Sequence, residues 1–364
     1  MGKLTYREIN EEDVARISEF RKSHFPFNSS IRCYEPEYYK WKSFGNPIQK
    51  GEMWLAEDGD IIVGINIITP KRMKVLDSVI TGAESGDAFT HPDYQGRGIF
   101  TNLMISNRDS VIKNGINLIY GVDPSNKSAP PLRRLNHIPT RVKVHNLIKP
   151  VNMKPLHTEK INMPRLLAVL LAIPAFFSPI VRIYSYTTTR IGALRSADSS
   201  VSIRQVSSFP EDIDLFGEKA GANYDVMLVR SKDYLEWRYI ENPDAYSIMT
   251  ATDNKGTTVG YLIAKLGFYR GAPVGYIVDF LTIEDNSKIF KKLLLASLGE
   301  FNRMGVSFIS TWAVKGSFYK RILSQFGFVP FGKVTLICFQ NELGRQITNN
   351  HYKWHFTMGD SDQI

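Results

Sequence analysis

The sequence repeats itself after 196 residues, and this internal repeat limits the possible folds more than any other feature. The segment Tyr38-Tyr39-Lys40-Trp41-Lys42 returns as Tyr234-Leu235-Glu236-Trp237-Arg238. The pairs Asn46-Pro47 and Val63-Gly64 return, at the same separation of 196, as Asn242-Pro243 and Val259-Gly260. Chance does not keep Trp, Asn-Pro and Val-Gly in register over such a length. The chain of 364 residues therefore predicts two tandem copies of one fold.

The copies diverge most in the loop that follows one strand. The strand end Asp87-Ala88-Phe89-Thr90 corresponds to Asp279-Phe280-Leu281-Thr282 in the second copy. Eight residues, 91–98, follow in the first copy, whereas only six, 283–288, follow in the second before the copies match again. The shorter loop has no glycine and contains the acidic pair Glu284-Asp285. We therefore expect the two loops to differ in what they bind.

The longer loop has the composition of an anion-binding turn. Gln95-Gly96-Arg97-Gly98 lies between an apolar strand and a helix pattern that begins at Ile99 and stops near Gly115. The first turn of a helix carries free N–H groups and a partial positive charge, so glycines there let the backbone approach a phosphate. Arg97 adds a positive charge. The segment predicts a diphosphate ligand, and an ordinary tight turn is the alternative.

This segment resembles the pyrophosphate loop of the GNAT acyltransferases, whose pattern is Gln/Arg-x-x-Gly-x-Gly/Ala. Gln95 and Gly98 match the pattern, and Phe100 departs from it at the last position. Asn126 begins a second family mark, Asn-x-x-Ala, after the next strand. The family's frequent tyrosine falls at Arg133 here, so no tyrosine general acid is expected in this domain.

The resemblance and the repeat together imply an α/β protein with two tandem GNAT-like domains, each built on a mixed sheet. We expect an acyl-CoA-binding domain over residues 1–155 and an apolar linker or helical segment over 156–197. A C-terminal domain with a degenerate CoA loop is expected over 198–364. This second domain either forms a wall of the acceptor site, because pockets favour the seam between domains, or serves only as a scaffold.

The GNAT resemblance implies acyl-CoA as co-substrate and assigns residues to it. In this family, backbone N–H groups of the strand that leads into the loop help to hold the acyl carbonyl. The expected CoA-binding residues lie on that strand, in the loop and after the next strand. They are Ala88, Phe89, Thr90, Gln95, Gly96, Arg97, Gly98, Ile99, Phe100 and Asn126.

GNAT enzymes transfer the acyl group by direct attack of an amine on the thioester, so no covalent nucleophile is required. An ammonium group must lose a proton to react, so a carboxylate is expected nearby. Asp87 and Glu84 are the candidates, and a regular strand would place them on opposite faces. Asp87 recurs as Asp279 in the copy without the loop, which also fits a structural role. A water-mediated proton path is the further alternative.

Over nearly its whole length the chain resembles tandem GNAT proteins with paired Trp-Lys/Arg-x-x-x-Asn-Pro-like segments. Many of these proteins resemble enzymes of bacterial surface-polysaccharide synthesis that N-acylate a nucleotide-linked amino sugar. For such an acceptor, Arg238 is a candidate phosphate ligand, with bracing of the fold as its alternative. Tyr224 and Trp312 are candidates to stack on a base or sugar, with core packing as the alternative. Asp360 and Asp362 could hold an ammonium or hydroxyls, or belong to a solvated tail.

Composition narrows the partners. The net charge of +9 is spread over scattered basic residues, which fits phosphate-bearing small molecules and does not predict nucleic-acid binding. The two cysteines, Cys33 and Cys338, lie far apart without metal-ligand spacing, so we expect a reduced cytoplasmic protein without a metal. The first residues lack the apolar core of a signal peptide. No obligate protein partner is evident.

An apolar run between Arg165 and Arg182 is too short to span a bilayer and is interrupted by two prolines. We expect a linker helix buried between the domains. Peripheral contact with a membrane surface is the alternative.

These observations predict an N-acyltransferase that moves an acetyl or short hydroxyacyl group, such as 3-hydroxybutanoyl, from acyl-CoA to the amine of a dTDP- or UDP-linked amino sugar. Two alternatives remain open. One is transfer to a peptide, lipid or antibiotic amine, and the other is a non-catalytic CoA-binding tandem module.

Overall fold

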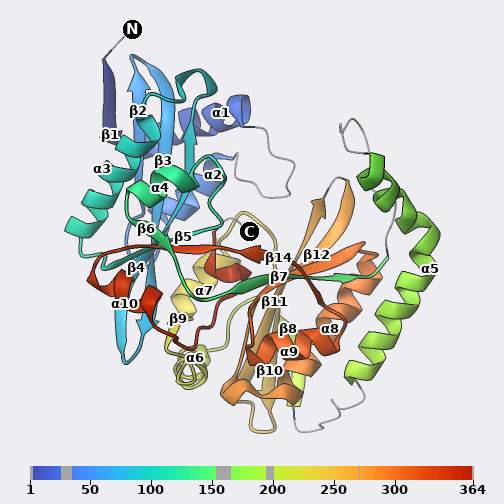
Figure 1. Cartoon of the computed structure of the whole chain (residues 1–364). Helices are drawn as coiled ribbons and strands as arrows, with labels where there is room; N and C mark the ends of the chain where they lie inside the picture. Colours follow the sequence, from blue (N-terminus) through green and yellow to red (C-terminus); the bar gives the residue numbers. More distant parts are fainter. Residues whose placement is uncertain (1–2, 26–34, 153–164, 194–200, 270, 363–364) are drawn as a thin grey trace.

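Two mixed β-sheets lie side by side in a computed structural model of the chain, each with helices packed against it (Figure 1). The structure describes residues 3–25, 35–152, 165–193, 201–269 and 271–362, without the side chains of 165–178. Cys33 lies outside the described residues. The predicted α/β class with two mixed sheets is confirmed.

The first sheet has eight strands among the described residues. Its order is β1-β2-β3-β4-β5-β15-β6, and β9 pairs with β3. The strands are β1 (Leu4–Glu8), β2 (Glu52–Asp58), β3 (Ile61–Val75), β4 (Ser78–Thr90), β5 (Leu118–Val122), β6 (His137–Pro139), β9 (Val226–Leu228) and β15 (Leu336–Phe339). Its helices are η1 (Glu11–Asp13), α1 (Val14–His24), α2 (Pro36–Tyr39), η2 (Lys40–Phe44), η3 (Pro92–Tyr94), α3 (Ile99–Lys113), α4 (Ala129–Arg134) and α10 (Glu342–Asn349).

The second sheet repeats this plan with seven described strands in the order β14-β7-β13-β12-β11-β10-β8. The strands are β7 (Val144–Pro150), β8 (Val201–Val206), β10 (Ser247–Asp253), β11 (Thr258–Tyr269), β12 (Ala272–Thr282), β13 (Phe308–Val314) and β14 (Val329–Val334). The helices of this half are α5 (Arg165–Ala193), α6 (Ile213–Gly221), α7 (Lys232–Tyr239), η4 (Ile283–Asp285), α8 (Ser287–Met304), α9 (Phe318–Gln325) and η5 (Met358–Asp360).

The two sheets exchange a strand. β7 follows the strands of the first sheet in sequence but lies between β13 and β14 of the second. β15 takes the equivalent place in the first sheet, between β5 and β6. The predicted boundaries at residues 155 and 197 stay predictions, and the exchange means that sheets and sequence copies do not divide at one point.

Helix α5 lies at the outer edge of the second sheet (Figure 1) and packs against α8, α9 and β7. Lys149 of β7 fixes its second half by donating hydrogen bonds to the Ser185 carbonyl (3.2 Å) and to Thr188 Oγ1 (3.0 Å). The predicted linker segment is helical, and α5 packs against elements of the second sheet. The side chains of the predicted apolar run up to residue 178 lie outside the described residues, so its burial between the domains stays a prediction. No helix among the described residues is long and apolar enough to cross a membrane.

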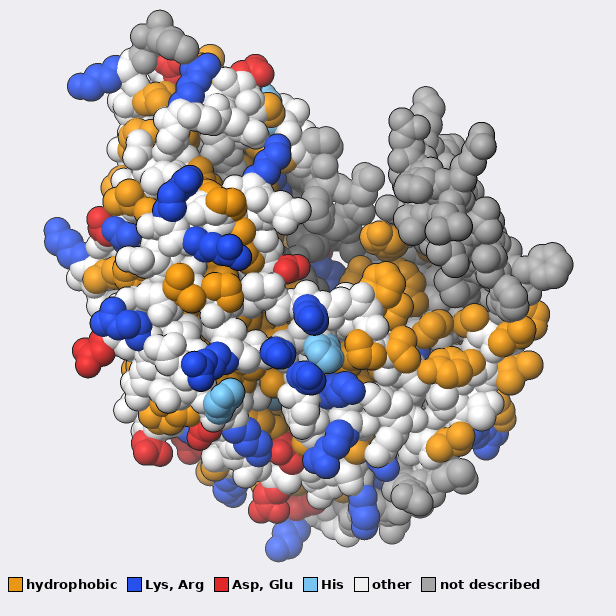
Figure 2. Space-filling model, in the orientation of Figure 1, with side chains coloured by type: hydrophobic (Ala, Val, Ile, Leu, Met, Phe, Trp, Pro, Cys, Tyr) orange, Lys and Arg blue, Asp and Glu red, His pale blue; other side chains and the backbone are white. Residues whose placement is uncertain are grey.

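On the face seen in Figure 2, hydrophobic side chains gather on the right, over the half that contains α5 and the second sheet. Most Lys and Arg side chains on this face are scattered over the rest of the molecule. Among the described side chains of α5, the large exposed apolar ones are Ile180, Ile183, Tyr184, Tyr186 and Ile191.

A pair of tryptophans from the two sequence copies joins the two halves. Trp41 and Trp237 stack with ring centroids 4.7 Å apart and an interplanar angle of 16°. Each indole N–H donates to the backbone carbonyl of the other residue, at 2.7 Å from Trp41 and 3.0 Å from Trp237. Both rings are buried, so the repeated motif forms a reciprocal contact between the copies.

The C-terminal segment 354–362 is buried between the two halves. Trp354, Phe356 and Met358 contribute to the largest hydrophobic core. The alternative of a solvated acidic tail is therefore wrong.

Replacement of Trp237 by Phe keeps an aromatic ring but removes the donor to the buried Trp41 carbonyl. We expect Trp237→Phe to lower the free energy of unfolding by about 1–3 kcal/mol, the cost of an unsatisfied buried polar group. Trp41→Phe should have an effect of the same sign and similar size, since it removes the reciprocal bond. Urea unfolding followed by circular dichroism measures both; an unchanged midpoint in either variant would contradict the assignment.

Candidate active site

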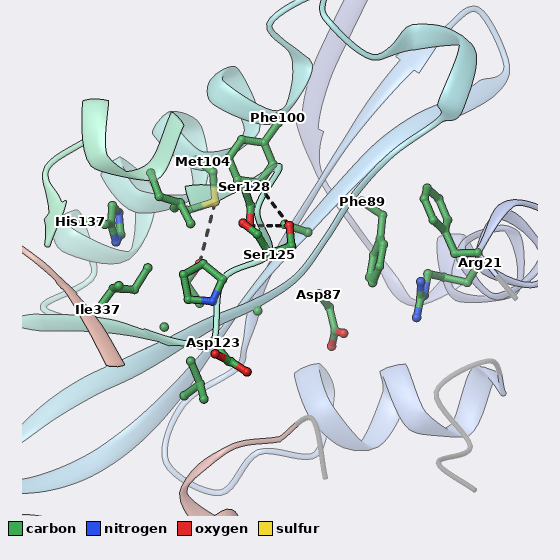
Figure 3. A pocket seen from close by; sticks show the side chains of 18 of the residues that line it. Arg21, Asp87, Phe89, Phe100, Met104, Asp123, Ser125, Ser128, His137 and Ile337 are labelled. Carbon is green, nitrogen blue, oxygen red and sulfur yellow. Dashed lines mark hydrogen bonds between the residues drawn. The ribbon is translucent and has the colours of Figure 1, made fainter. Parts of the chain in front are cut away.

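A cleft of about 560 Å³ opens where two parallel strands separate (Figure 3). β4 and β5 pair only from Gly82 with Leu118 to Glu84 with Tyr120. Beyond Glu84 no described strand pairs with this edge of β4, so its backbone groups face the cleft. Peptide N–H groups on such an edge can bind the carbonyl and amide groups of an extended ligand.

β4 is irregular at the point where the cleft begins. The register with β3 shifts between Ile65 and Ile67, so that Asp87 and Ala88 together face one residue. Asp87 adopts a positive φ of 44°, which is uncommon for a residue other than glycine. Such a bulge redirects side chains next to a site. Here the bulge interrupts the alternation of faces that a regular strand would have, and Asp87 lines the cleft.

The glycine loop lies at the N-terminus of α3, as predicted. Gly96 and Gly98 have φ values of 79° and 78°, a left-handed conformation that favours glycine. The loop from Gln95 to Gly98 is exposed, and nothing lies within 4 Å of where a Cβ of either glycine would be. The Arg97 guanidinium is held near the loop, 4.5 Å from the ring centroid of Tyr94. These features leave the first-turn N–H groups of α3 open to a phosphate.

The equivalent place in the second copy is closed by its own side chains. Asn286 caps α8, and its side chain accepts hydrogen bonds from the N–H groups of Lys288 (3.0 Å) and Ile289 (3.3 Å). The Asp285 carboxylate accepts a hydrogen bond from the Tyr224 hydroxyl and pairs with Lys353 at 3.2 Å. An occupied, acidic helix start disfavours a second anion site. Of the two helix starts, the one in the first copy is therefore the candidate anion site.

Two carboxylates, Asp87 and Asp123, line the cleft, and Asp87 is the one held by hydrogen bonds from neighbouring side chains. It accepts hydrogen bonds from the Lys42 ammonium at 2.6 Å and the Tyr38 hydroxyl at 3.1 Å. Burial raises the pKa of Asp87, but the Lys42 ammonium outweighs it and leaves this pKa below its usual value. Asp87 is therefore ionised at neutral pH.

Glu84, the other catalytic candidate, does not line the cleft. It is buried and pairs with the Lys71 ammonium at 2.7 Å. It also accepts hydrogen bonds from Ser361 Oγ at 2.7 Å and the Asp362 N–H at 2.9 Å. These contacts anchor the C-terminal segment, which is a structural role.

The other predicted CoA residues divide into two groups. Ala88, Phe89 and Phe100 line the cleft, whereas Thr90, Ile99 and Asn126 do not. Ile99 is buried in a core cluster with Leu103, and Asn126 is exposed in the turn between β5 and α4. Its neighbours Ser125 and Ser128 line the cleft instead. Contact of all ten residues with CoA stays a prediction.

None of the five predicted acceptor residues is among the described residues that line the cleft. The Arg238 guanidinium donates to the Ser361 carbonyl at 2.9 Å and to the Tyr246 hydroxyl at 3.0 Å. Asp360 pairs with Arg230 at 2.8 Å, and Asp362 with Lys71 at 2.9 Å. Tyr224 bonds to Asp285, and Trp312 is buried against Phe356. Each has a structural role, and acceptor binding by them stays a prediction.

Sequence reasoning missed several residues that line the cleft. Arg21 lies over the Phe89 ring with its guanidinium carbon 3.5 Å from the ring centroid, and the Phe25 ring is 5.0 Å from that of Phe89. On the opposite side lie Met104, His137 and Ile337 (Figure 3). His137 and Ile337 come from β6 and from the exchanged strand β15, so no local motif could have placed them together.

Comparisons with known proteins agree with this geometry. Residues 5–127 match the family model described as Acetyltransferase (GNAT) domain. No curated protein matches the chain by sequence. Residues 5–127 of the first copy therefore match a GNAT domain, which supports the predicted class of GNAT-type N-acyltransferase.

Three solved structures show the fold over nearly the whole chain. A probable N-acyltransferase from Enterococcus faecalis has 12% identity and a TM-score of 0.61, covering 92% of this chain and 72% of that one. Saccharomyces cerevisiae N-myristoyltransferase with bound myristoyl-CoA has 14% identity and a TM-score of 0.60, covering 93% and 83%. A tandem GNAT protein from the clavulanic acid biosynthesis pathway has 12% identity and a TM-score of 0.57, covering 92% and 98%. The predicted tandem GNAT fold is confirmed.

Replacement of Gly98 by Asp tests the anion site. The substitution adds left-handed strain at φ 78° and a negative charge at the N-terminus of α3. We expect CoA binding to weaken at least about 30-fold in isothermal titration calorimetry.

Gly115→Asp is the matched control, because Gly115 has a φ of 85°, lies just past the other end of α3 and has equal space for a side chain. It should retain wild-type affinity for CoA. Unchanged CoA affinity in Gly98→Asp would show that the site lies elsewhere.

Proposed function

We propose that the protein transfers an acyl group from acyl-CoA to an amine, with the donor bound in the cleft of the first copy. The observation that carries this proposal is the position of the cleft between an open helix N-terminus and an ionised carboxylate. The donor's diphosphate would bind at Gly96–Gly98, and its pantetheine arm would extend along the free edge of β4. The amine would approach from the side of α1 and α2, where Asp87 lies.

The proposed reaction is direct attack of the amine on the thioester carbonyl. As the C–N bond forms, the carbonyl oxygen becomes negative, and N–H groups of the β4 edge near the bulge can stabilise it. The C–S bond then breaks and CoA leaves as the thiol. The ammonium form of the acceptor gives up one proton before the attack, and the attacking nitrogen gives up a second that ends on the CoA sulfur, so the balance is amide, free CoA thiol and one released proton.

Asp87 has two roles in this proposal. Its ionised carboxylate attracts the ammonium form of the acceptor and orients it toward the thioester. Once the nitrogen has attacked the carbonyl, the pKa of the N–H group in the adduct falls steeply. Even a weakly basic carboxylate such as that of Asp87 can then accept the proton. Lys42 and Tyr38 hold the carboxylate in place through their hydrogen bonds.

For the acceptor we propose a nucleotide-linked amino sugar, with acetyl or a short hydroxyacyl group as the transferred group. The support is the resemblance of the paired Trp motifs to enzymes of this class, together with the net charge of +9. Arg21, Phe25 and Phe89 at the amine side of the cleft offer a guanidinium for phosphate and rings for a sugar face.

The direct test measures release of CoA thiol from acetyl-CoA and 3-hydroxybutanoyl-CoA with a panel of dTDP- and UDP-linked amino sugars. Turnover should occur with one donor and one sugar, and the product should gain the mass of the acyl group. Parallel reactions contain a peptide, a lipid amine and an aminoglycoside. Turnover only with one of these would overturn the sugar proposal, and CoA binding without any thiol release would favour a non-catalytic module.

Asp87→Asn removes the proposed charge while preserving shape. We expect kcat to fall by a factor of about 100 or more, the usual contribution of a positioned acid–base group. The affinity for CoA should change little, because the phosphate loop is untouched.

Asp279→Asn is the matched control at the equivalent position of the second copy. Asp279 is buried against Arg230 at 3.2 Å and lies outside the cleft. This variant should lose stability but keep kcat in its folded fraction. A kcat of Asp87→Asn within about threefold of wild type would contradict the role of Asp87.

A further inference from the structure

One end of the cleft is not occupied by any part of the reactants in the proposed reaction. On the α3 and α4 side of the sheet, the cleft continues past the thioester position into a recess. Met104, Leu132 and Ile337 form its apolar wall, and they belong to one hydrophobic cluster with Phe100. An acetyl group at the bulge would not cover this wall.

Two polar side chains in the recess lack strong hydrogen bonds. His137 is only 2% exposed, and its Nδ1 has no hydrogen-bond partner among the described residues. Ser85 Oγ has a weak contact with Met104 Sδ, at 3.9 Å. A buried polar group without a partner is costly, so the unpartnered His137 Nδ1, in the same cleft as the weakly bonded Ser85 hydroxyl, indicates a missing hydrogen-bonding ligand.

Glycines leave room for such a ligand between the two strands. Gly86 and Gly121 both line the cleft where β4 and β5 diverge. A Cβ on Gly121 would lie 3.3 Å from an Ile337 side-chain atom and 3.4 Å from the Ser85 carbonyl oxygen, which is close contact. A side chain there would narrow the passage from the bulge to the recess.

The donor's acyl chain is the part of the reactants that this recess can reach. The diphosphate and pantetheine approach from the loop at Gly98, along Phe100, and the amine approaches from the Asp87 side. The chain beyond the thioester carbonyl lies at the bulge and can continue only toward the amine side or into the recess.

We propose that this recess, the His137 subsite, holds the acyl chain of the donor and selects a short chain that carries a hydroxyl or another hydrogen-bonding group. The inference rests on the proposed function and narrows its donor. Apolar carbons of the chain would pack on Met104, Leu132 and Ile337, and the polar substituent would bond to His137 or Ser85.

The charge state of His137 suits a neutral substituent. Burial and, to a lesser extent, nearby Arg108 lower the pKa of His137 to about 4. The imidazole is therefore neutral at physiological pH, with one nitrogen as donor and the other as acceptor. A hydroxyl can bond to either nitrogen, whereas a chain with only carbon atoms leaves the imidazole unsatisfied.

The experiment compares direct binding of CoA, acetyl-CoA, butanoyl-CoA and 3-hydroxybutanoyl-CoA to the full chain by isothermal titration calorimetry. We expect 3-hydroxybutanoyl-CoA to bind at least about fivefold more tightly than butanoyl-CoA, the ratio that one net hydrogen bond provides. In His137→Phe the ratio should fall to about one or below, while the affinity for CoA itself should be unchanged.

His355→Phe is the matched control. His355 is also buried, and its Nε2 has no partner among the described residues, but it lies in the C-terminal segment outside the cleft. This variant should keep the wild-type preference. His137→Asn, which retains hydrogen-bonding groups, should keep more of the preference than His137→Phe, and the wild-type comparison needs no variant at all.

The possible failures are distinguishable. Binding of CoA with equal affinities for butanoyl and 3-hydroxybutanoyl derivatives would overturn the His137 subsite and leave the proposed function standing. A preference that persists in His137→Phe would also overturn it. Absence of binding to any of the four compounds would overturn the proposed function, and the subsite with it.

Discussion

A single buried carboxylate connects the two halves of this protein. Asp362 lies within ion-pair distance of Lys71 (2.9 Å), Lys42 (3.8 Å) and Arg238 (3.9 Å), and all three cations are buried. Burial alone would raise the pKa of Asp362, but these cations lower it to about 2, so the carboxylate stays ionised. A buried cation without a counter-ion is strongly destabilising. Lys42 and Lys71 come from the first copy and Arg238 from the second, so the interface depends on the last described residues of the chain.

The same arrangement connects the interface to the reaction site. Lys42 contacts both Asp362 and Asp87, and the Tyr38 hydroxyl bonds to Asp87 while lying 3.4 Å from the Asp362 carbonyl. The carboxylate in the cleft is therefore positioned by residues that are themselves fixed by the C-terminal segment. The second copy has no open anion loop, but Trp237 and Arg238 hold the segment and the first copy in place. This gives the degenerate copy a physical role without requiring that it bind substrate.

The parts of this structure that sequence could predict are local or periodic. The repeat predicted two related sheets, and the glycine loop predicted an open helix start, because both depend on residues close together in the chain. The exchange of β7 and β15 could not be predicted, since nothing in a strand's own sequence selects which of two similar sheets it joins. For the same reason Ile337, which lies on the exchanged strand β15, was missed. Asp87 and Glu84 were found as candidates, but only the bulge and the lysine partners show that one lines the cleft and the other anchors the tail.

Divergence between the copies can be understood from the requirements of one helix start. In the first copy the glycines at 96 and 98 provide left-handed turns and leave the N–H groups of α3 unoccupied. In the second, Asn286 satisfies two of the equivalent groups, and the shortened loop carries Glu284 and Asp285 at positive φ. A capped helix start is stable without a ligand, whereas an uncapped one leaves polar groups to be satisfied from outside. Stability and anion binding thus compete at one place in the fold, and the two copies differ in which they favour.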